Sequence, residues 1–186
     1  MRRVLLLAIA TAIALAQPPA SSWVPVRGSY QNRGGYGYRV TLPHGLVGYR
    51  APAPAPGHGL AVELDSPANR IEIDGSYNSL EHVTPQAVLA STVAWISNKA
   101  ASIEPPRYHP ARLGGLSATE VVVRYREKQT GVMRLRRSIA AIRRSVPPGT
   151  MEIVYQIRLD TAAERTAKDT AVYSAILQSF LLASLT

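Results

Sequence analysis

Residues 151–160 read MEIVYQIRLD, and this stretch decides the fold. Every odd-numbered position from Met151 to Leu159 is apolar, whereas the even-numbered positions are polar except for Val154. Alternation with a period of two is typical of a strand that buries one face. The stretch therefore predicts a half-buried strand over residues 151–159 that needs a partner for its apolar face.

The residues after this strand predict a helix that supplies the partner. Thr161 and Glu164 have the spacing of a capping box at a helix start. Val172, Ile176 and Phe180 then recur every four residues and form an apolar stripe. We expect this helix to run to about residue 182.

The rest of the chain repeats the pattern of strands followed by a helix. Thr84 suits an N-cap and Pro85 the first helical position, which predicts a helix that fades by Ala101. Alternation and turn residues predict further strands, at residues 36–42, 60–64, 71–73, 119–126 and 132–143. The expected fold class is α+β, with one antiparallel sheet of about six strands flanked by helices.

The first hairpin has a register that can be predicted from its apolar residues. With residues 66–69 as its loop, Leu64 lies opposite Ile71 and Val62 lies opposite Ile73. The other face then collects carboxylates beside Arg70, namely Glu63, Asp65, Glu72 and Asp74.

The N-terminal residues have the pattern of a signal peptide. Arg2 and Arg3 precede an apolar run that ends with small residues at Ala14 and Ala16. We expect residues 1–16 to be a signal peptide, residues 17–35 a flexible arm, and residues 36–186 a single domain. The prediction places the protein outside the cytoplasm, in the periplasm after cleavage near Ala16; an uncleaved membrane anchor is the alternative reading.

Composition limits the classes of function. The formal charge is +9, and it is +7 without Arg2 and Arg3. This charge favours an acidic protein, an envelope polymer or peripheral contact with an anionic membrane, and an exported protein seldom meets nucleic acid. The absence of cysteine excludes disulfides, thiolate metal sites, thiol nucleophiles and lipid attachment at a lipobox.

An arginine-rich hairpin is the strongest candidate for a contact surface. Alternate residues on neighbouring strands share a face, so several of its guanidinium groups should form one patch. Arginine favours paired hydrogen bonds with carboxylate or phosphate. The predicted partner-binding residues are Arg124, Arg126, Lys128, Arg134, Arg136 and Arg137, with Arg143 and Arg144 at the end of the hairpin. The proline-rich loop from Pro52 to Gly59 is a second candidate.

Metal binding or hydrolysis is the alternative reading. It would use the acidic hairpin face or the loop histidines, which are His44, His58, His82 and His109. A flat strand face does not wrap a calcium ion, and none of these histidines has a second ligand at helical spacing. The sequence also lacks the nucleophile elbow, the phosphate loop and the dinucleotide fingerprint. We therefore expect no cofactor, no metal site and no catalytic residues.

Three short segments resemble the PsbP/Mog-like fold family, which has many exported bacterial members. They are the aromatic opening strand at residues 36–43, the entry Leu113-Gly114-Gly115-Leu116, and residues 175–180 with the pair Ser179-Phe180. The resemblance implies an antiparallel sheet flanked by helices and binding or assembly roles without catalysis. The family covers both sheet faces. Here either both helices pack on the apolar face, or the proline-rich loop and the arm partly cover the other.

The predicted function is an exported accessory or immunity-type protein that contacts an acidic partner without catalysis. A third hypothesis is a domain whose charge only holds it at an anionic envelope.

Overall fold

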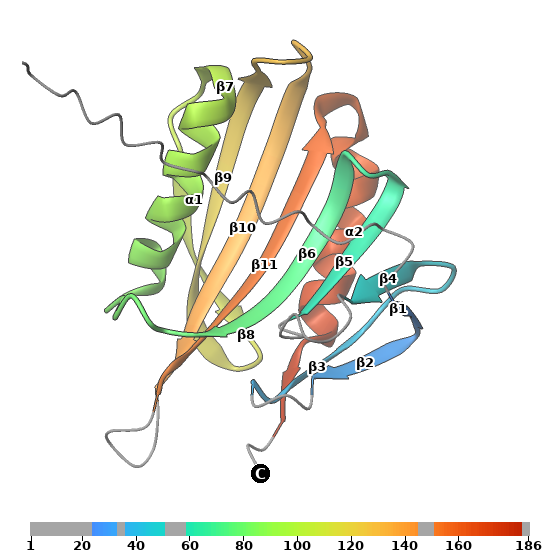
Figure 1. The fold of residues 1–186 in the computed structure, drawn as a ribbon, viewed down its shortest axis with the longest axis vertical. Coiled ribbons are helices and arrows are strands. Elements are labelled where there is room, and N and C mark those ends of the chain that lie inside the picture. The colour runs from blue at the N-terminus through green and yellow to red at the C-terminus, as the bar shows by residue number, and fades with distance from the viewer. Residues whose placement is uncertain (1–23, 33–35, 51–58, 145–150, 184–186) are drawn as a thin grey trace, which may run out of the picture.

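The computed structural model describes residues 24–32, 36–50, 59–144 and 151–183. Its main element is a nine-stranded antiparallel sheet in the order β1-β4-β5-β6-β11-β10-β9-β7, with β8 also paired to β9 (Figure 1). A three-stranded sheet, β12-β3-β2, lies beside it. The strands are β1 (Val24–Arg27), β2 (Ser29–Asn32), β3 (Tyr38–Thr41), β4 (Val47–Arg50), β5 (Gly59–Ser66), β6 (Asn69–Tyr77), β7 (Ala100–Ile103), β8 (Arg107–Leu113), β9 (Leu116–Glu127), β10 (Met133–Arg143), β11 (Ile153–Ala162) and β12 (Leu181–Leu182). The helices are α1 (Pro85–Lys99), the short η2 (Ala163–Arg165) and α2 (Thr166–Ser179).

Strand β11 lies in the middle of the large sheet, between β6 and β10. Its residues Ile153, Tyr155, Ile157 and Leu159 are buried on one face, as the alternation predicts. Met151 is 64% exposed and precedes the strand, which starts at Ile153. The buried face packs against Tyr173 and Ile176 of α2, so the predicted strand and its helical cover are both present.

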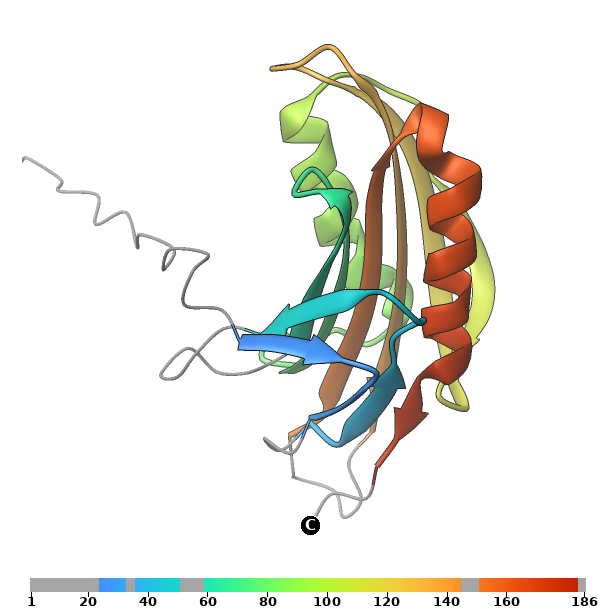
Figure 2. The same cartoon turned by 90° about the vertical axis from the view of Figure 1, so that its right-hand side faces the viewer.

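The two helices cover opposite faces of the large sheet (Figure 2). Leu89 and Ile96 of α1 pack on Val121 and Val123 of β9, in a core separate from the one under α2. The even-numbered face of β11 therefore faces α1 instead of solvent, and Val154 belongs to the α1 core. The sequence suggested two ways of covering the sheet: both helices on the apolar face, or the proline-rich loop and the arm on the other face. Neither placed α1 on the more polar face, where the structure has it.

The prediction of about six strands in a single sheet is wrong. The segment expected to be a flexible arm contains β1 and β2, and residues 44–59, where the sequence predicts a loop rich in proline and glycine, contain β4. These strands have four residues each, and each pairs with a segment more than ten residues away or with another short strand. Strands this short contain too few residues to show a clear alternation. Whether they form depends on their pairing with other strands and on their burial. The segment around Pro105 separates β7 from β8, both of which pair with β9.

The small sheet packs a group of aromatic rings over the α2 face. Tyr38 of β3 stacks on Phe180 with ring centroids 5.3 Å apart, and Tyr155 of β11 meets the same Phe180 ring at 5.5 Å. The predicted end of the last helix is wrong: α2 ends at Ser179, and Leu181 pairs with Arg39 in β12–β3. Phe180 has an extended backbone conformation just after the helix, and its ring is buried among the tyrosines. The chain changes from helix to strand at this residue.

The two predicted helix starts have different outcomes. The Thr84 side chain accepts a hydrogen bond from Ala87 N at 3.2 Å, with Pro85 at the first helical position, as predicted. The prediction of a capping box at Thr161 is wrong. Thr161 belongs to β11, and its hydroxyl donates a hydrogen bond to Asp169 at 2.5 Å. Arg165 precedes α2 without a side-chain cap.

The first hairpin has a different register from the predicted one. Val62 lies opposite Ile71 and Leu60 opposite Ile73, with an irregularity between Glu63 and Ser66. Asn69 explains it: its side chain donates to Asp65 Oδ1 at 2.9 Å and to Ser66 Oγ at 3.3 Å, and accepts from Ala162 N at 3.0 Å. The shift equals two residues, so the apolar side chains still share the buried face.

The entry into the central hairpin is a tight glycine turn between β8 and β9. Gly114 and Gly115 have φ angles of 56° and 86°, which side chains other than glycine rarely adopt. A Cβ atom on Gly114 would also lie 3.0 Å from the Phe180 ring. The turn therefore ties the sheet closely to the end of α2.

Candidate functional site

The structure separates the six predicted partner-binding residues: five lie on one or the other face of the sheet and one lies in a turn. Arg134 and Arg136 lie opposite Tyr125 and Val123 of β9, on the face that α1 covers. Arg124, Arg126 and Arg137 have the opposite parity and lie on the α2 face. Lys128 lies in the β9–β10 turn and donates to Asn98 O at 3.0 Å. The predicted single patch is therefore not formed, and the partner-binding role of these residues stays a prediction.

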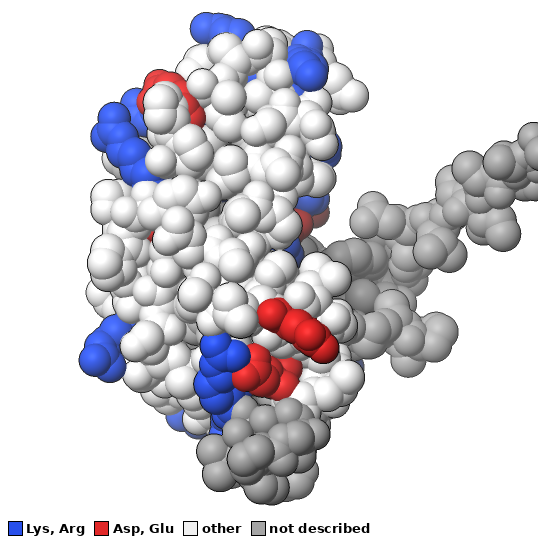
Figure 3. Space-filling view, turned by 90° about the vertical axis from the view of Figure 1, so that its left-hand side faces the viewer, with Lys and Arg blue, Asp and Glu red and all other residues white. Residues whose placement is uncertain are grey.

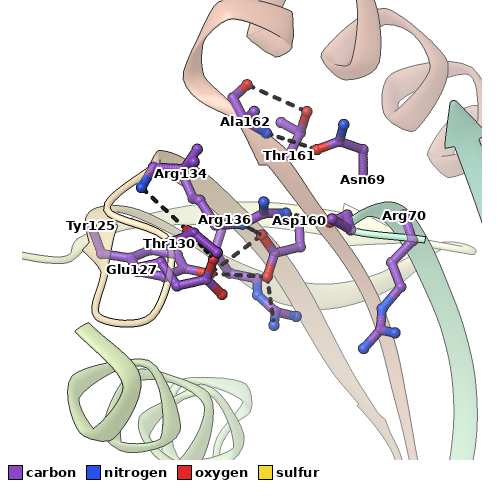
Figure 4. Close-up of polar contacts among 12 residues, drawn as sticks. Asn69, Arg70, Tyr125, Glu127, Thr130, Arg134, Arg136, Asp160, Thr161 and Ala162 are labelled. Atoms are coloured by element: carbon purple, nitrogen blue, oxygen red, sulfur yellow. Dashed lines mark hydrogen bonds and ion pairs between the residues drawn. The ribbon is translucent and has the colours of Figure 1, made fainter. Parts of the chain in front are cut away.

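A buried charge cluster forms around Asp160 on the α1 face (Figure 4). Its carboxylate accepts from Arg134 Nε at 2.8 Å and pairs with Arg136 Nη2 at 3.0 Å. The Tyr125 hydroxyl donates to the same carboxylate at 3.1 Å, and Arg134 Nη2 donates to Ala68 O. Burial, and then the charge of Asp160, raises the pKa of Tyr125 to about 12. We call these four residues — Asp160, Arg134, Arg136 and Tyr125 — the Asp160 cluster.

Helix α1 closes over one side of the Asp160 cluster through Trp95. The guanidinium carbon of Arg136 lies 4.9 Å from the centroid of the Trp95 ring, and Lys99 Nζ lies 4.1 Å from it. Cations at such distances are attracted by the ring electrons. Arg136 is therefore held between a carboxylate and an aromatic ring and is only 5% exposed.

A groove adjoins the cluster between α1 and strands β6, β10 and β11. It has a volume of about 360 Å³. Within it, the Glu72 carboxylate pairs with Arg70 at 2.9 Å and lies 3.1 Å from Arg158 Nε. The lining residues are Arg70, Glu72, Ser91, Thr92, Trp95, Arg136, Gln156 and Arg158. We call this feature the α1 groove.

The α2 face carries a separate set of arginines beside the helix. Arg107 of β8 lies opposite Val122 of β9, so its side chain shares a face with Arg124 and Arg126. All three are exposed. We call Arg107, Arg124 and Arg126 the outer arginine strip. Sequence reasoning missed Arg107, because the prolines before it indicated a break instead of a new strand.

Arg137 lies on the same face but is already neutralised. It forms two hydrogen bonds of 2.9 Å with the Glu120 carboxylate, and its guanidinium carbon lies 5.3 Å from the centroid of the Tyr173 ring. Burial of Tyr173 between α2 and the sheet raises its pKa well above the ordinary value. Arg137 therefore fastens α2 to the sheet.

The last two arginines of the hairpin also hold local structure. Arg143 donates to Ala183 O at 3.1 Å. Arg144 pairs with Glu152 at 2.5 Å and donates to Val83 O at 2.6 Å. The Arg144 hydrogen bond, and next that of Asn78, lowers the pKa of Glu152. Neither arginine joins the outer arginine strip.

The acidic hairpin face and the histidines do not assemble into a metal site in the described part of the chain. Glu72 is held by arginines, and Asp65 pairs with Arg165 at 2.6 Å on η2. No group of three or more His, Cys, Asp or Glu side chains among the described residues could hold a metal ion. His58 and the proline-rich stretch at residues 51–58 lie outside the described residues, as does the expected signal peptide.

The surface on the side of α1 and β7 carries little charge (Figure 3). Lysine and arginine side chains stand at its rim, and most of the area between them is uncharged. Helix α1 contributes to this because Lys99 is the single charged residue in its sequence. The positive charge of the protein is therefore not gathered on this side.

Solved structures show which fold this is. One match is LpqN, described as involved in cell envelope biogenesis of Mycobacterium tuberculosis, with a TM-score of 0.58, 16% identity and coverage of 87% of this chain and 91% of LpqN. Another is cyanobacterial PsbP (CyanoP) from Synechocystis sp. PCC 6803, with a TM-score of 0.54, 15% identity and coverage of 94% and 98%. The chain has a PsbP-like fold. The fold expected from the sequence resemblance is thus confirmed, with a larger sheet than expected.

Comparisons at the level of sequence add no relative. No protein-family model matches the chain. No curated protein matches it either. Among the described residues, no helix is long and apolar enough to cross a membrane.

Proposed function

We propose that this chain is an exported, non-enzymatic binding or assembly protein that docks an acidic protein partner in the cell envelope. The outer arginine strip is the docking surface. The observation that carries this proposal is that Arg107, Arg124 and Arg126 are exposed on adjoining strands and form no ion pair with any described residue. Arg126 donates a hydrogen bond to a backbone oxygen, that of Gly131, at 2.8 Å.

The charges of the outer arginine strip suit contact with a partner better than stabilisation of the fold. Like charges on neighbouring strands oppose folding unless a partner offsets them. Arg137, on the same face, has such a partner in Glu120, whereas the strip has none among the described residues. Guanidinium groups match carboxylates in shape and charge, so an acidic protein surface supplies what the strip lacks.

The edge of the sheet favours side-chain recognition over strand addition. Strand β8 pairs with β9, and Pro110 lies within it. Proline blunts an edge strand because it has no N–H to offer a further strand. A partner would therefore reach the strip through its own acidic side chains.

Envelope location is the second part of the proposal. It is supported by the signal-peptide pattern of residues 1–16 and by the shared fold with LpqN, which is described as involved in cell envelope biogenesis. The metal or hydrolase alternative gains no such support, because arginines engage Glu72 and Asp65.

Affinity capture from envelope extract tests the proposal. Wild type is compared with a triple variant that changes Arg107, Arg124 and Arg126 to serine. A matched control changes three exposed arginines elsewhere and removes the same charge: Arg27, Arg39 and Arg50. We expect mass spectrometry to find an acidic protein with wild type and control that is lost with the strip variant. Equal recovery with the strip variant would contradict the proposal.

A further inference from the structure

The α1 groove carries more guanidinium groups than carboxylates. Glu72 pairs with Arg70 and Arg158, and Asp160 pairs with Arg134 and Arg136. Two carboxylates thus serve four guanidinium groups, which leaves two positive charges in excess. Glu63 and Asp74 lie on the same sheet face, on β5 and β6, but neither lines the groove, so they are not counted in this excess.

Polar atoms beside the groove lack hydrogen-bond partners within the described structure. Arg136 is 5% exposed and its Nε has no partner. Arg158 Nε lies close to Glu72 but is not aligned for a hydrogen bond. The hydroxyl of Ser138, opposite Arg158 in the β10–β11 pairing and fully buried, is also without one. Leaving buried donors unpaired is energetically unfavourable, so a bound acceptor at this position would be stabilising.

We infer that the α1 groove binds a phosphate group. Phosphate monoesters carry a charge of about −1.5 to −2 near neutral pH and present three acceptor oxygens. This matches two excess positive charges and donors from three strands, whereas a carboxylate brings one charge. Arg70, Arg136 and Arg158 are the principal contacts.

The shape of the groove indicates more than an isolated ion. Its volume of about 360 Å³ leaves room for the remainder of a phosphorylated molecule. Ser91, Thr92 and Gln156 line the rest and offer neutral hydrogen-bonding groups. The phosphate could belong to a soluble phosphomonoester or to a lipid headgroup, which share this chemistry. The groove lies on the opposite sheet face from the outer arginine strip, so the inference is independent of the proposed function.

Calorimetric titration with named probes tests the site. The full chain is titrated with inorganic phosphate and with glycerol 3-phosphate, against sodium chloride of equal ionic strength. The variants are Arg70→Gln and Arg158→Gln, whose side chains are 46% and 28% exposed, so that each leaves Glu72 with one arginine. Arg124→Gln in the outer arginine strip is the matched control. We expect binding to weaken about tenfold in each groove variant and to be unchanged in the control.

Sedimentation with vesicles distinguishes the two sources. Preference for vesicles containing phosphatidic acid over pure phosphatidylcholine, lost in Arg158→Gln, assigns the phosphate to a headgroup. Soluble binding without vesicle preference assigns it to a soluble phosphomonoester. Absence of binding to every probe, or equal affinity in wild type and both groove variants, would overturn the inference.

Discussion

Arg134 Nε on β10 lies 2.8 Å from Asp160 Oδ1 on the neighbouring strand β11, with side chains only 7% and 11% exposed. Two residues that look like ordinary polar positions in the sequence thus form a buried ion pair. The pair lies on the sheet face that α1 covers, and Arg136 and Tyr125 complete its contacts. The pair shows that the arginines of this hairpin lie in two different environments, one buried under α1 and one exposed.

Asp160→Asn should strongly destabilise the protein. The change leaves the guanidinium groups of Arg134 and Arg136 buried without their carboxylate. Removing one partner of a buried pair typically costs about 3–5 kcal/mol. Urea unfolding should show this loss, and Glu164→Gln on the exposed η2 should change stability by less than about 0.5 kcal/mol. A small effect of Asp160→Asn would mean that the cluster is hydrated and weak.

Paired arginine substitutions should separate the two faces. Arg134→Ser with Arg136→Ser breaks the Asp160 cluster and should destabilise by at least about 3–5 kcal/mol. Arg124→Ser with Arg126→Ser removes the same charge from an exposed surface and should change the free energy of unfolding by less than about 1 kcal/mol. Thermal unfolding of both double variants measures the difference. Similar losses in the two variants would contradict the division between faces.

The raised pKa of Tyr125 predicts that the protein loses stability at alkaline pH. Burial and Asp160 raise its pKa from 10.0 to about 12, so between these values the unfolded chain releases a proton that the folded protein keeps. The stabilisation is complete below pH 10 and is lost as the pH rises through about 12. Tyr125→Phe should therefore flatten the fall in unfolding free energy there by about 1.4 kcal/mol per pH unit. An unchanged slope in urea titrations at several pH values would exclude this coupling.

Local sequence patterns predicted the long elements well. Thr84, Pro85 and the apolar stripe predicted α1, alternation predicted β9 and β11, and the turns on either side predicted β10. The short strands β1, β2 and β4 were missed because they form by pairing with segments elsewhere in the chain, which local sequence patterns do not reveal. The register of the first hairpin was wrong because the Asn69 side chain, bonded to Asp65 and Ala162, holds an irregularity that apolar spacing does not reveal.

The site was predicted less well than the fold. Alternation placed Arg124 and Arg126 on the same face of their strand, and the structure shows that this face leaves both exposed. It could not show that α1 covers the other face, so Arg134 and Arg136 were grouped with them. The pairing of Arg134 with Tyr125 was the missing information, since it places both arginines beside inward-facing residues of β9.

Site-specific photo-crosslinking in cells tests the docking surface most directly. A photoreactive benzoylphenylalanine replaces His109, which is exposed beside Arg107 on the same face of β8, or Gln86 on the exposed side of α1 as a control. The account predicts a discrete protein adduct from position 109 that disappears when Arg124 and Arg126 are also changed to serine, and none from position 86. An adduct from position 86 alone would contradict it.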